Sequence, residues 1–330
     1  MPSSRTPTSR LAQIHSFAEK LLPVSEVGSF VESVFQELGK RPVVVWRDVP
    51  LLLWENEDIS SFPLDLPAWV TIPKTGIRPG LFPEHTTGEY YCADLSSVIL
   101  GLAWTRVMER SSSVVDLCAA PGGKAIIAWR ALRPEILICN EVIRKRVRIL
   151  ISNLNRMRTH GSRVYSLEVG AITKKLEGQV AVVLADVPCS AQSLGSEADY
   201  PFHKSSINGN LLRQRRILSN AAPLVSSGGL LVYMTCTFSP KENEDNMKWF
   251  LKKHPSFSAE TIPGYDALQS EFVDFACYRV WPHRRVQGCL LGRGGFVCVL
   301  KKEGELIDNT TFEWPEGIHS IDAEKSQVME

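Results

Sequence analysis

From Val114 onward the sequence alternates between short apolar runs and amphipathic stretches. The apolar runs have the length of strands, and the stretches between them have the spacing of helices. Strands that alternate with helices predict a parallel, doubly wound α/β sheet whose ligand site lies at the carboxyl ends of the strands. The predicted strands are Val114–Cys118, Ile136–Asn140, Val164–Leu167, Val180–Ala185 and Leu230–Met234, with an antiparallel edge strand at Phe296–Leu300. The predicted helices are 124–132, 141–158, 208–226 and 241–254.

The residues before this pattern have a different character. Residues 11–40 have helical spacing of apolar side chains, residues 42–90 hold two short predicted strands (Pro42–Trp46 and Ala68–Ile72) among prolines, and residues 93–108 predict a helix. Residues 303–330 hold eight acids and one lysine. We therefore expect a mixed helical and α+β module at 1–92, an α/β domain at 93–302, and an acidic tail without fixed structure at 303–330.

Composition excludes several classes of protein. The net charge is +1, so the chain is not a polycation that coats nucleic acid, and phosphate binding must come from local patches. No apolar run approaches the roughly 18 residues of a membrane span. The eight cysteines are scattered without C-x-x-C spacing, so we expect no metal site and reduced thiols, as in a cytoplasmic protein. Residues 1–20 faintly resemble an organelle transit peptide, but a frayed cytoplasmic N-terminus explains them more simply.

The first candidate site is Asp116-Leu117-Cys118-Ala119-Ala120-Pro121-Gly122-Gly123-Lys124, directly after the first predicted strand. Small residues at a strand-to-helix turn let a ligand approach the backbone, and the helix amides favour electron-rich groups. The dinucleotide and phosphate-loop spacings are absent. A tight packing turn is the alternative.

Two acids follow later strands. Glu141 can accept hydrogen bonds from two ribose hydroxyls, and together with the glycine turn it indicates an adenosine-containing cofactor. Glu168 could contact the adenine edge. Each acid could instead be a helix-starting or surface residue.

Two cysteines stand just past predicted strands, Cys189 in Asp186-Val187-Pro188-Cys189-Ser190 and Cys236 in Thr235-Cys236-Thr237. A pair of thiols on neighbouring strands suits chemistry at carbon 5 of cytosine. A thiolate that adds to carbon 6 raises the electron density at carbon 5, which can then attack a sulfonium methyl. An Asp at ring atom N3 would offset the developing charge, and a second thiol could assist release.

These motifs match a known family. The chain resembles the Sun/Nop family of RNA cytosine-5 methyltransferases in three segments that occur in the family's order: D-L-C-A-A-P-G-G-K at 116–124, D-V-P-C-S at 186–190 and T-C-T-F-S-P-K-E-N-E at 235–244. The spacing of Glu141, Arg146, Leu150, Asn153 and Arg156 also matches, as does Arg279-Val280-Trp281-Pro282-His283. The resemblance covers residues 90–302 well and the N-terminal module loosely.

The resemblance implies a mostly parallel, seven-stranded class I (Rossmann-like) methyltransferase sheet and S-adenosylmethionine as the cofactor. It implies that Cys236 is the covalent nucleophile, that Cys189 helps to release the product, and that Asp186 and Lys124 lie at the reacting base. The implied cofactor contacts are Cys118, Ala119, Ala120, Pro121, Gly122, Gly123, Lys124, Glu141, Arg146, Glu168 and Asp186. The chain departs from the family at Ala191 and at 195–200, where a different substrate loop is expected.

Three local groups of basic residues are candidates for RNA binding. They are Arg144, Lys145, Arg146 and Arg148; Arg213, Arg215 and Arg216; and His283, Arg284 and Arg285. Aromatic side chains commonly support a splayed base, and the candidates are Tyr200, Phe202, Phe238 and Trp281. The alternatives are a solvated helix face and core packing. By family resemblance, the small module at 41–90 is expected to position the RNA.

The sequence thus predicts an S-adenosylmethionine-dependent RNA (cytosine-5)-methyltransferase acting on rRNA or tRNA. We expect a monomer with RNA as its partner and no membrane or metal. One alternative is a catalytically weak or inactive RNA-binding or assembly factor of the same fold, against which both retained cysteines argue. A small-molecule or adenine methyltransferase is the other, but such sites favour an aromatic residue where Cys189 stands.

Overall fold

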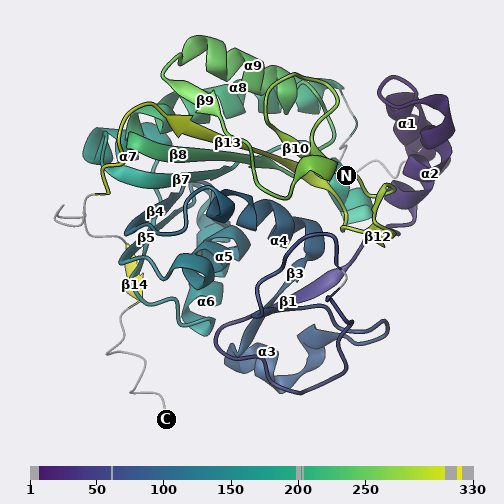
Figure 1. The fold of residues 1–330 in the computed structure, drawn as a ribbon, viewed down its shortest axis with the longest axis horizontal. Helices are drawn as coiled ribbons and strands as arrows, with labels where there is room; N and C mark the ends of the chain where they lie inside the picture. Colours follow the sequence, from purple (N-terminus) through teal and green to yellow (C-terminus); the bar gives the residue numbers. More distant parts are fainter. Residues whose placement is uncertain (1–6, 61, 198–201, 203, 309–317, 322–330) are drawn as a thin grey trace.

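A large sheet runs through the part of the chain that the computed structural model describes, namely residues 7–60, 62–197, 202, 204–308 and 318–321 (Figure 1). Its five parallel neighbours, in spatial order, are β8 (Val225–Thr235), β7 (Val180–Asp186), β4 (Ser113–Asp116), β5 (Ile136–Asn140) and β6 (Ser162–Tyr165). β13 (Gly295–Lys302) runs antiparallel beside β8, and β10 (Tyr278–Val280) pairs with β13. These seven strands confirm the predicted doubly wound, mostly parallel methyltransferase sheet, although the short strands β9 (Phe257–Ala259) and β14 (His319–Ile321) bring the described sheet to nine strands instead of the predicted seven.

The prediction that Phe296–Leu300 lies at the edge of the sheet is wrong. β13 is antiparallel as expected, but it has β8 on one side and both β10 and β9 (Phe257–Ala259) on the other. Its side chains from Phe296 to Leu300 are fully buried. An apolar run of this kind is stable inside a sheet, and the shorter strands take the edge.

Helices cover both faces of the sheet (Figure 1). One face carries α4 (Leu95–Leu102), α5 (Gly123–Leu132) and α6 (Arg144–Arg156). The other carries α7 (Val169–Leu176), α8 (Lys204–Ala221) and α9 (Glu244–Lys253). Within the described residues, no helix combines the length and the apolar character needed to cross a membrane.

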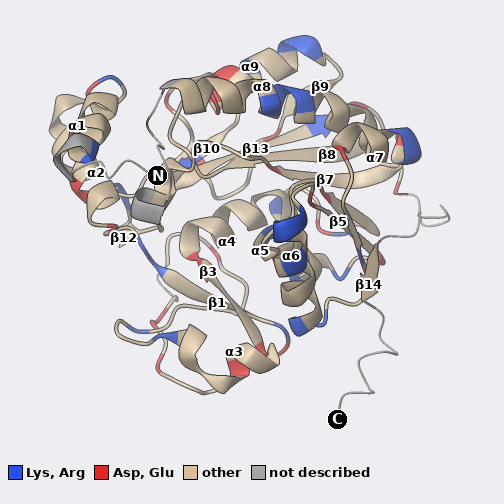
Figure 2. Ribbon diagram, turned by 180° about the vertical axis from the view of Figure 1, so that it is seen from behind, with Lys and Arg blue, Asp and Glu red and all other residues tan. Residues whose placement is uncertain are grey.

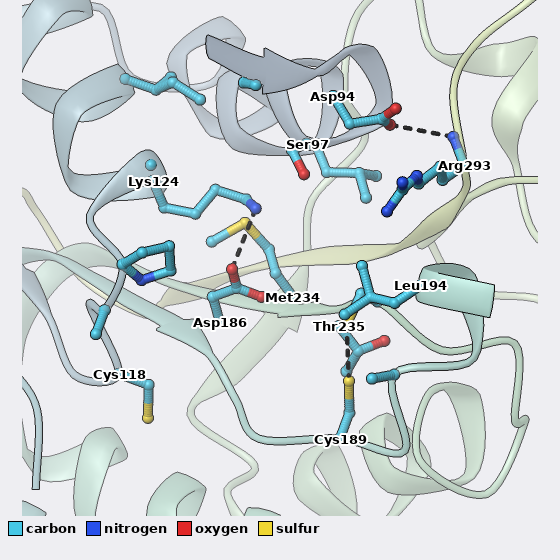
Figure 3. A pocket seen from close by; sticks show the side chains of 18 of the residues that line it. Asp94, Ser97, Cys118, Lys124, Asp186, Cys189, Leu194, Met234, Thr235 and Arg293 are labelled. Carbon is cyan, nitrogen blue, oxygen red and sulfur yellow. Dashed lines mark hydrogen bonds and ion pairs between the residues drawn. The ribbon is translucent and has the colours of Figure 1, made fainter. Parts of the chain in front are cut away.

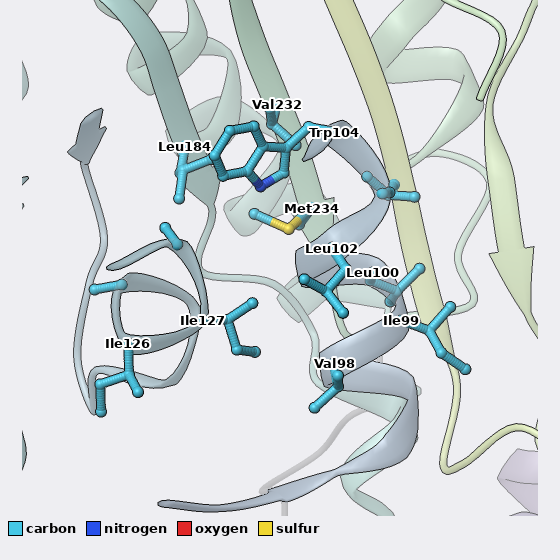
Figure 4. Close-up of a cluster of buried hydrophobic side chains, with 14 of the residues drawn as sticks. Val98, Ile99, Leu100, Leu102, Trp104, Ile126, Ile127, Leu184, Val232 and Met234 are labelled. Atoms are coloured by element: carbon cyan, nitrogen blue, oxygen red, sulfur yellow. The ribbon is translucent and has the colours of Figure 1, made fainter. Parts of the chain in front are cut away.

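Alternate residues of the parallel strands enter different cores, because successive strand side chains point to opposite faces. Val182 and Leu184 pack under α4 and α5, whereas Val183 packs under the helices of the other face. Figure 4 shows the first core, where Trp104 lies over Leu184, Val232 and Met234. Since both faces are buried, the strands read as continuous apolar runs in the sequence.

Helix boundaries differ from the predicted ones by a few residues. The predicted helix 141–158 begins at Arg144, because the Glu141 carboxylate accepts a hydrogen bond from the Ile143 amide in a turn ahead of the helix. The predicted helix 93–108 is α-helical only over Leu95–Leu102 and continues as a 3₁₀ turn, Ala103–Arg106. α7 was not predicted, because eight residues hold too few apolar positions for a periodic signal.

The described residues of the N-terminal module form two separate bodies. α1 (Pro7–Ala18) and α2 (Val24–Phe35) pair with each other and bury Phe30 against Phe238 and Trp281 of the α/β domain. The second body is a small antiparallel sheet in which β1 (Pro42–Trp46) lies between β2 (Val70–Thr71) and β3 (Tyr90–Asp94). This module also contains the short helix α3 (Pro83–Thr87), and the α/β domain contains a small hairpin of β11 (Arg285–Val286) and β12 (Cys289–Leu290).

The expected absence of structure after residue 302 is wrong for one segment. β14 (His319–Ile321) pairs antiparallel with β6, and Ile321 is buried. The pairing satisfies backbone groups at the outer edge of β6. Residues 309–317 and 322–330 of the predicted tail lie outside the described residues.

One buried amide ties three strand ends together at the carboxyl edge of the sheet. Asn140, the last residue of β5, has no exposed surface, and its Nδ2 donates to the Leu117 carbonyl after β4 (3.2 Å). The same Nδ2 donates to the Leu167 carbonyl after β6 (3.0 Å), and Asn140 Oδ1 accepts from the Leu167 amide (3.0 Å). This amide therefore holds the loops after β4 and β6 at a set distance from β5.

Asn140→Ala is expected to lower the free energy of unfolding by about 3 kcal/mol, because Leu117 and Leu167 would keep buried polar groups without partners. Urea denaturation followed by circular dichroism measures the change. Asn208→Ala on the exposed side of α8 is the control, with an expected change within about 0.5 kcal/mol. Equal stability of the two variants would contradict this role of Asn140.

Candidate functional site

A cavity of about 670 Å³ lies where the carboxyl ends of β4, β7 and β8 meet (Figure 3). Its walls come from the loop after each of these strands and from β3. The wall includes the predicted site residues Cys118, Ala119, Ala120, Pro121, Gly123, Lys124, Arg146, Asp186, Cys189 and Cys236. Ligands of doubly wound sheets bind at this edge, so the cavity is the candidate functional site.

The two predicted cysteines meet in this cavity. Cys189 lies in the loop after β7 and Cys236 in the loop after β8, and their Sγ atoms are 3.2 Å apart, within hydrogen-bonding distance for sulfur. Both side chains are half-buried and unoxidised. The contact with Cys236, burial and the charge of Glu242 hold the pKa of the Cys189 thiol well above its usual range, so Cys189 remains protonated at neutral pH.

An ion pair lies beside the thiols. Lys124 Nζ, from the first turn of α5, donates to Asp186 Oδ2 at 3.1 Å (Figure 3). Burial is the largest single effect and favours the neutral amine, but the Asp186 carboxylate and the other negative charges nearby together raise the pKa of Lys124. A negative charge on Cys236 contributes in the same direction. The site therefore holds an amine whose positive charge is favoured by the groups around it.

Asp116 is a buried carboxyl group on the cavity wall at the end of β4. Its Oδ1 accepts from the Cys118 amide at 3.3 Å, and its Oδ2 has no hydrogen-bond partner among the described residues. Burial, and then the charge of Asp186, raise the pKa of Asp116 to about 7. A partly neutral carboxyl group with a free oxygen suits a polar or cationic part of a ligand.

The glycine turn is held by α6. Gly122, the one residue of 118–124 outside the cavity wall, has a φ of +118° that turns the chain into α5. Arg146 donates to the Ala120 carbonyl, and Asn153 Nδ2 donates to the Pro121 carbonyl at 2.8 Å. A Cβ atom at Gly123 would lie 3.3 Å from the Tyr91 ring, so little space remains there.

A second cavity of about 230 Å³ adjoins the first and shares Cys118, Arg146 and Pro188 with it. The predicted residues Glu141 and Glu168 both line it. Glu141 is almost fully buried and forms an ion pair with Arg146 at 2.9 Å. Glu168 is mostly exposed, with Arg216 at 3.4 Å. The two cavities together offer an elongated site that runs from Glu168 to the thiols.

The predicted RNA-contact residues differ in their exposure and in their contacts. Arg144, Lys145 and Arg148 on α6 are exposed, and so are Arg213 and Arg216 on α8 (Figure 2). The third basic group is mainly structural, because His283 and Arg284 bind Glu26 of α2 at 2.9 and 2.8 Å. Arg215 packs over Trp249 with 4.8 Å from its guanidinium carbon to the ring centre.

The aromatic candidates for base contacts pack against other aromatic side chains of the protein. Phe238 and Trp281 are buried and stack on each other with ring centres 5.5 Å apart, so the prediction that they contact a base is wrong. Phe202 packs on Phe17 of α1 at 5.2 Å. Tyr200 lies outside the described residues.

Sequence reasoning missed the wall that faces the thiols. It contains Tyr91 and Asp94 of β3, together with Arg293 from the loop before β13 (Figure 3). Asp94 caps α4 by accepting from the Ser96 amide at 3.0 Å, and it also accepts from the Arg293 amide at 3.1 Å. An Asp directly before an apolar helix, as at Asp94, is a recognisable capping signal in the sequence. The contact of Asp94 with Arg293, which lies about 200 residues later in the chain, has no such local signal.

Asp116 makes the stability of the cofactor-free protein depend on pH. Its pKa rises from 3.8 when unfolded to about 7 when folded, so folding binds a proton between these values. The free energy of unfolding of the wild type, relative to that of Asp116→Asn, should fall by no more than about 4 kcal/mol as the pH rises from about 4 to about 7. Above about pH 7 this difference should stay constant. Urea denaturation across this range tests the difference. Parallel curves for the two proteins would show that the Asp116 pKa is not raised.

Curated relatives match the segment that carries these loops. The chain is 28% identical over 201 residues to the ribosomal RNA small subunit methyltransferase F of Cronobacter sakazakii, which covers 58% of this chain and 42% of that protein. It is also 28% identical over 239 residues to the mitochondrial tRNA (cytosine(34)-C(5))-methyltransferase of Danio rerio, with coverage of 68% and 62%. The chain thus spans about two fifths to three fifths of the length of these relatives.

The chain also resembles a solved structure and matches the model of a protein family. A methyltransferase homolog protein from Pyrococcus horikoshii superposes with a TM-score of 0.70 over 92% of this chain and 99% of that chain, and at 19% identity this likeness shows the fold. The model of the family described as 16S rRNA methyltransferase RsmB/F matches residues 106–291. That segment is more than half of the chain and includes β4, both cysteine loops and the ion pair of Lys124 with Asp186. The chain therefore belongs to the RsmB/F methyltransferase family.

Proposed function

We propose that the protein transfers a methyl group from S-adenosylmethionine to carbon 5 of a cytosine in structured RNA, either rRNA or tRNA. The observation that carries this proposal is the contact of two thiols, 3.2 Å apart, in the same cavity as the partly buried Lys124–Asp186 pair. Two thiols with a fixed cation suit covalent activation of a pyrimidine ring. The names of the relatives, which act on rRNA and tRNA, point to the same substrates.

The residues present fit the cofactor. The two adjoining cavities form an elongated site, and the unpartnered Asp116 Oδ2 lies on its wall. Glu141 and Glu168 would hold the adenosine end, while residues 118–124, Arg146 and Asp186 would line the path toward the thiols. When bound, S-adenosylmethionine supplies an electrophilic methyl group on a sulfonium.

Cys236 would be the nucleophile. Its thiolate, stabilised by the Lys124 ammonium, forms a bond to carbon 6 of cytosine, and the electron pair of the ring double bond becomes available at carbon 5. Asp186, which Lys124 also orients, would contact the base, and the positive charge of Lys124 would offset the negative charge that develops on the ring. Carbon 5 then accepts the methyl group, which leaves a proton and a methyl group on the same carbon.

Cys189 would complete the reaction. Contact with Cys236 is the largest cause of its raised pKa, and this cause changes once Cys236 is bonded to the ring. The Cys189 thiol then loses its own proton to solvent more easily, and the resulting thiolate can take the proton from carbon 5. The electron pair of that C–H bond restores the ring double bond, and the C–S bond breaks with its electrons returning to Cys236.

RNA would approach across α6 and α8. The exposed residues Arg144, Lys145 and Arg148, with Arg213 and Arg216, lie on the two helices that flank the second cavity. They supply local positive charge to a chain whose net charge is only +1. The small β1–β3 sheet would position the RNA from the other side, because β3 forms one wall of the main cavity.

Cys189→Ala is expected to accumulate a covalent protein–RNA adduct that survives a denaturing gel, because the nucleophile can add but is released slowly. Cys236→Ala should form no adduct and lose at least about 10³-fold in methyl transfer. Release of tritium from cytosine labelled at carbon 5 measures turnover independently. Full activity and no adduct in the Cys189→Ala protein would overturn the two-thiol scheme, and binding of RNA without turnover would favour the inactive assembly factor.

Glu141→Ala is expected to weaken S-adenosylmethionine binding by about 10- to 100-fold, because charge-assisted hydrogen bonds to the ribose would be lost. Isothermal titration calorimetry measures the dissociation constant without RNA. Glu177→Ala, an exposed acid at the end of α7, is the control and should bind as the wild type does. Equal binding by both variants would remove Glu141 from the cofactor site.

A further inference from the structure

A buried carboxyl group lies behind the two cysteine loops. Glu242, just before α9, has no exposed surface, and its side chain accepts four hydrogen bonds. Oε1 accepts from the Ser190 amide at 3.0 Å and from Gln214 Nε2 at 2.9 Å. Oε2 accepts from the Ser190 hydroxyl at 2.6 Å. Glu242 therefore binds both the backbone and the side chain of the residue that follows Cys189.

The same network reaches the other cysteine loop. The Ser190 and Thr237 hydroxyls are 2.7 Å apart, and Thr237 is the residue that follows Cys236. The Thr237 hydroxyl also lies 3.5 Å from Glu242 Oε2. A continuous chain of hydrogen bonds thus joins the residue after one thiol to the residue after the other, with Glu242 as its anchor.

Burying a carboxylate is costly unless donors surround it, and partial loss of such a network leaves unsatisfied polar groups. Burial raises the pKa of Glu242, and its donors act against that effect. Stability alone would be served as well by apolar packing at this position. The hydrogen-bond donors to this carboxylate come from the two cysteine loops and from Gln214 of α8. The carboxylate therefore fixes the positions of these segments relative to one another.

We propose that Glu242 is a positioning residue that holds the sulfur atoms of Cys189 and Cys236 in contact by clamping Ser190 and Thr237. The inference deepens the proposed function and rests on it for its catalytic meaning. Cys236 must bond to the base while Cys189 stays next to the reacting carbon atoms, so small changes in either loop should slow the reaction. Glu242 itself is not among the residues that line the cavity.

The distance between the thiols can be measured without any substrate. Hydrogen peroxide oxidises two neighbouring thiols to a disulfide, with two thiol hydrogens leaving in two molecules of water as the peroxide is reduced. One thiol is first oxidised to a sulfenic acid, which the other thiol then attacks. At peroxide concentrations high enough that this second step limits the rate, the rate of Cys189–Cys236 disulfide formation, followed by mass spectrometry of peptides, reports how often the sulfur atoms are in contact. Methyl transfer gives kcat and KM in parallel, and thermal unfolding gives stability.

Glu242→Ala is expected to slow disulfide formation about tenfold and to lower kcat by about 10²-fold, while the KM for RNA changes less than about threefold. Glu242→Gln should recover most of both rates. Its amide oxygen can replace Oε1, and its amide nitrogen can donate to Ser190 Oγ, whose hydroxyl then donates to Thr237. Impairment of Glu242→Gln equal to that of Glu242→Ala would overturn positioning by hydrogen bonds.

Two serines provide a matched control should Glu242→Ala fail to fold. The Ser190 and Ser270 hydroxyls are both buried, and each donates to a buried glutamate at 2.6 Å, Ser190 to Glu242 and Ser270 to Glu244. Ser190→Ala should slow disulfide formation severalfold, whereas Ser270→Ala should change stability but not that rate. Equal rates in the two variants would overturn the clamp. If the wild-type protein forms the disulfide at the expected rate but transfers no methyl group to RNA, that result would instead count against the proposed function.

Discussion

The parallel pairing of β7 with β8 is the interaction on which the site depends. Asp186 at the end of β7 is in register with Met234, near the end of β8, so both strands deliver their loops at the same height. Cys189 and Cys236 follow within three residues and therefore meet. A one-residue slip of either strand would turn its buried side chains to the opposite face, so the two apolar cores protect this register.

Several ionisable side chains lie partly or fully buried at the carboxyl edge of the sheet, and each is stabilised in a different way. Lys124 neutralises Asp186, Ser190 and Gln214 surround Glu242, and Asp116 responds by a raised pKa. Compensation by hydrogen bonds also fixes position, because donors and acceptors must keep their geometry. The polar residues that make the site chemically useful therefore also limit how far its loops can move.

Distant parts of the chain support the same loops. Phe30 of α2 packs edge-on against Phe238, two residues past Cys236, with ring centres 5.2 Å apart. Arg279 forms a buried ion pair with Glu244 and donates to the Phe238 carbonyl at 3.0 Å. The loop after β8 is thus packed on one side by the N-terminal helices and tied on the other by β10. This arrangement explains why Phe238, close to Cys236 in sequence, packs in the core.

Local sequence was sufficient for the sheet and for the edge at which its site lies. Runs such as Val180–Ala185 are apolar throughout because both faces are covered, and turn residues after them mark the loops that bear Cys189 and Cys236. Partners that come from far along the chain leave no local signal. The placement of β13 between β8 and β10, the ion pairs of Glu26 with His283 and Arg284, the wall from β3, and the bonds from Glu242 to Ser190 depend on which elements pack together. Periodicity and motif chemistry act between near neighbours and so determined the fold class and the candidate residues, whereas long-range packing decided their distances, burial and charge.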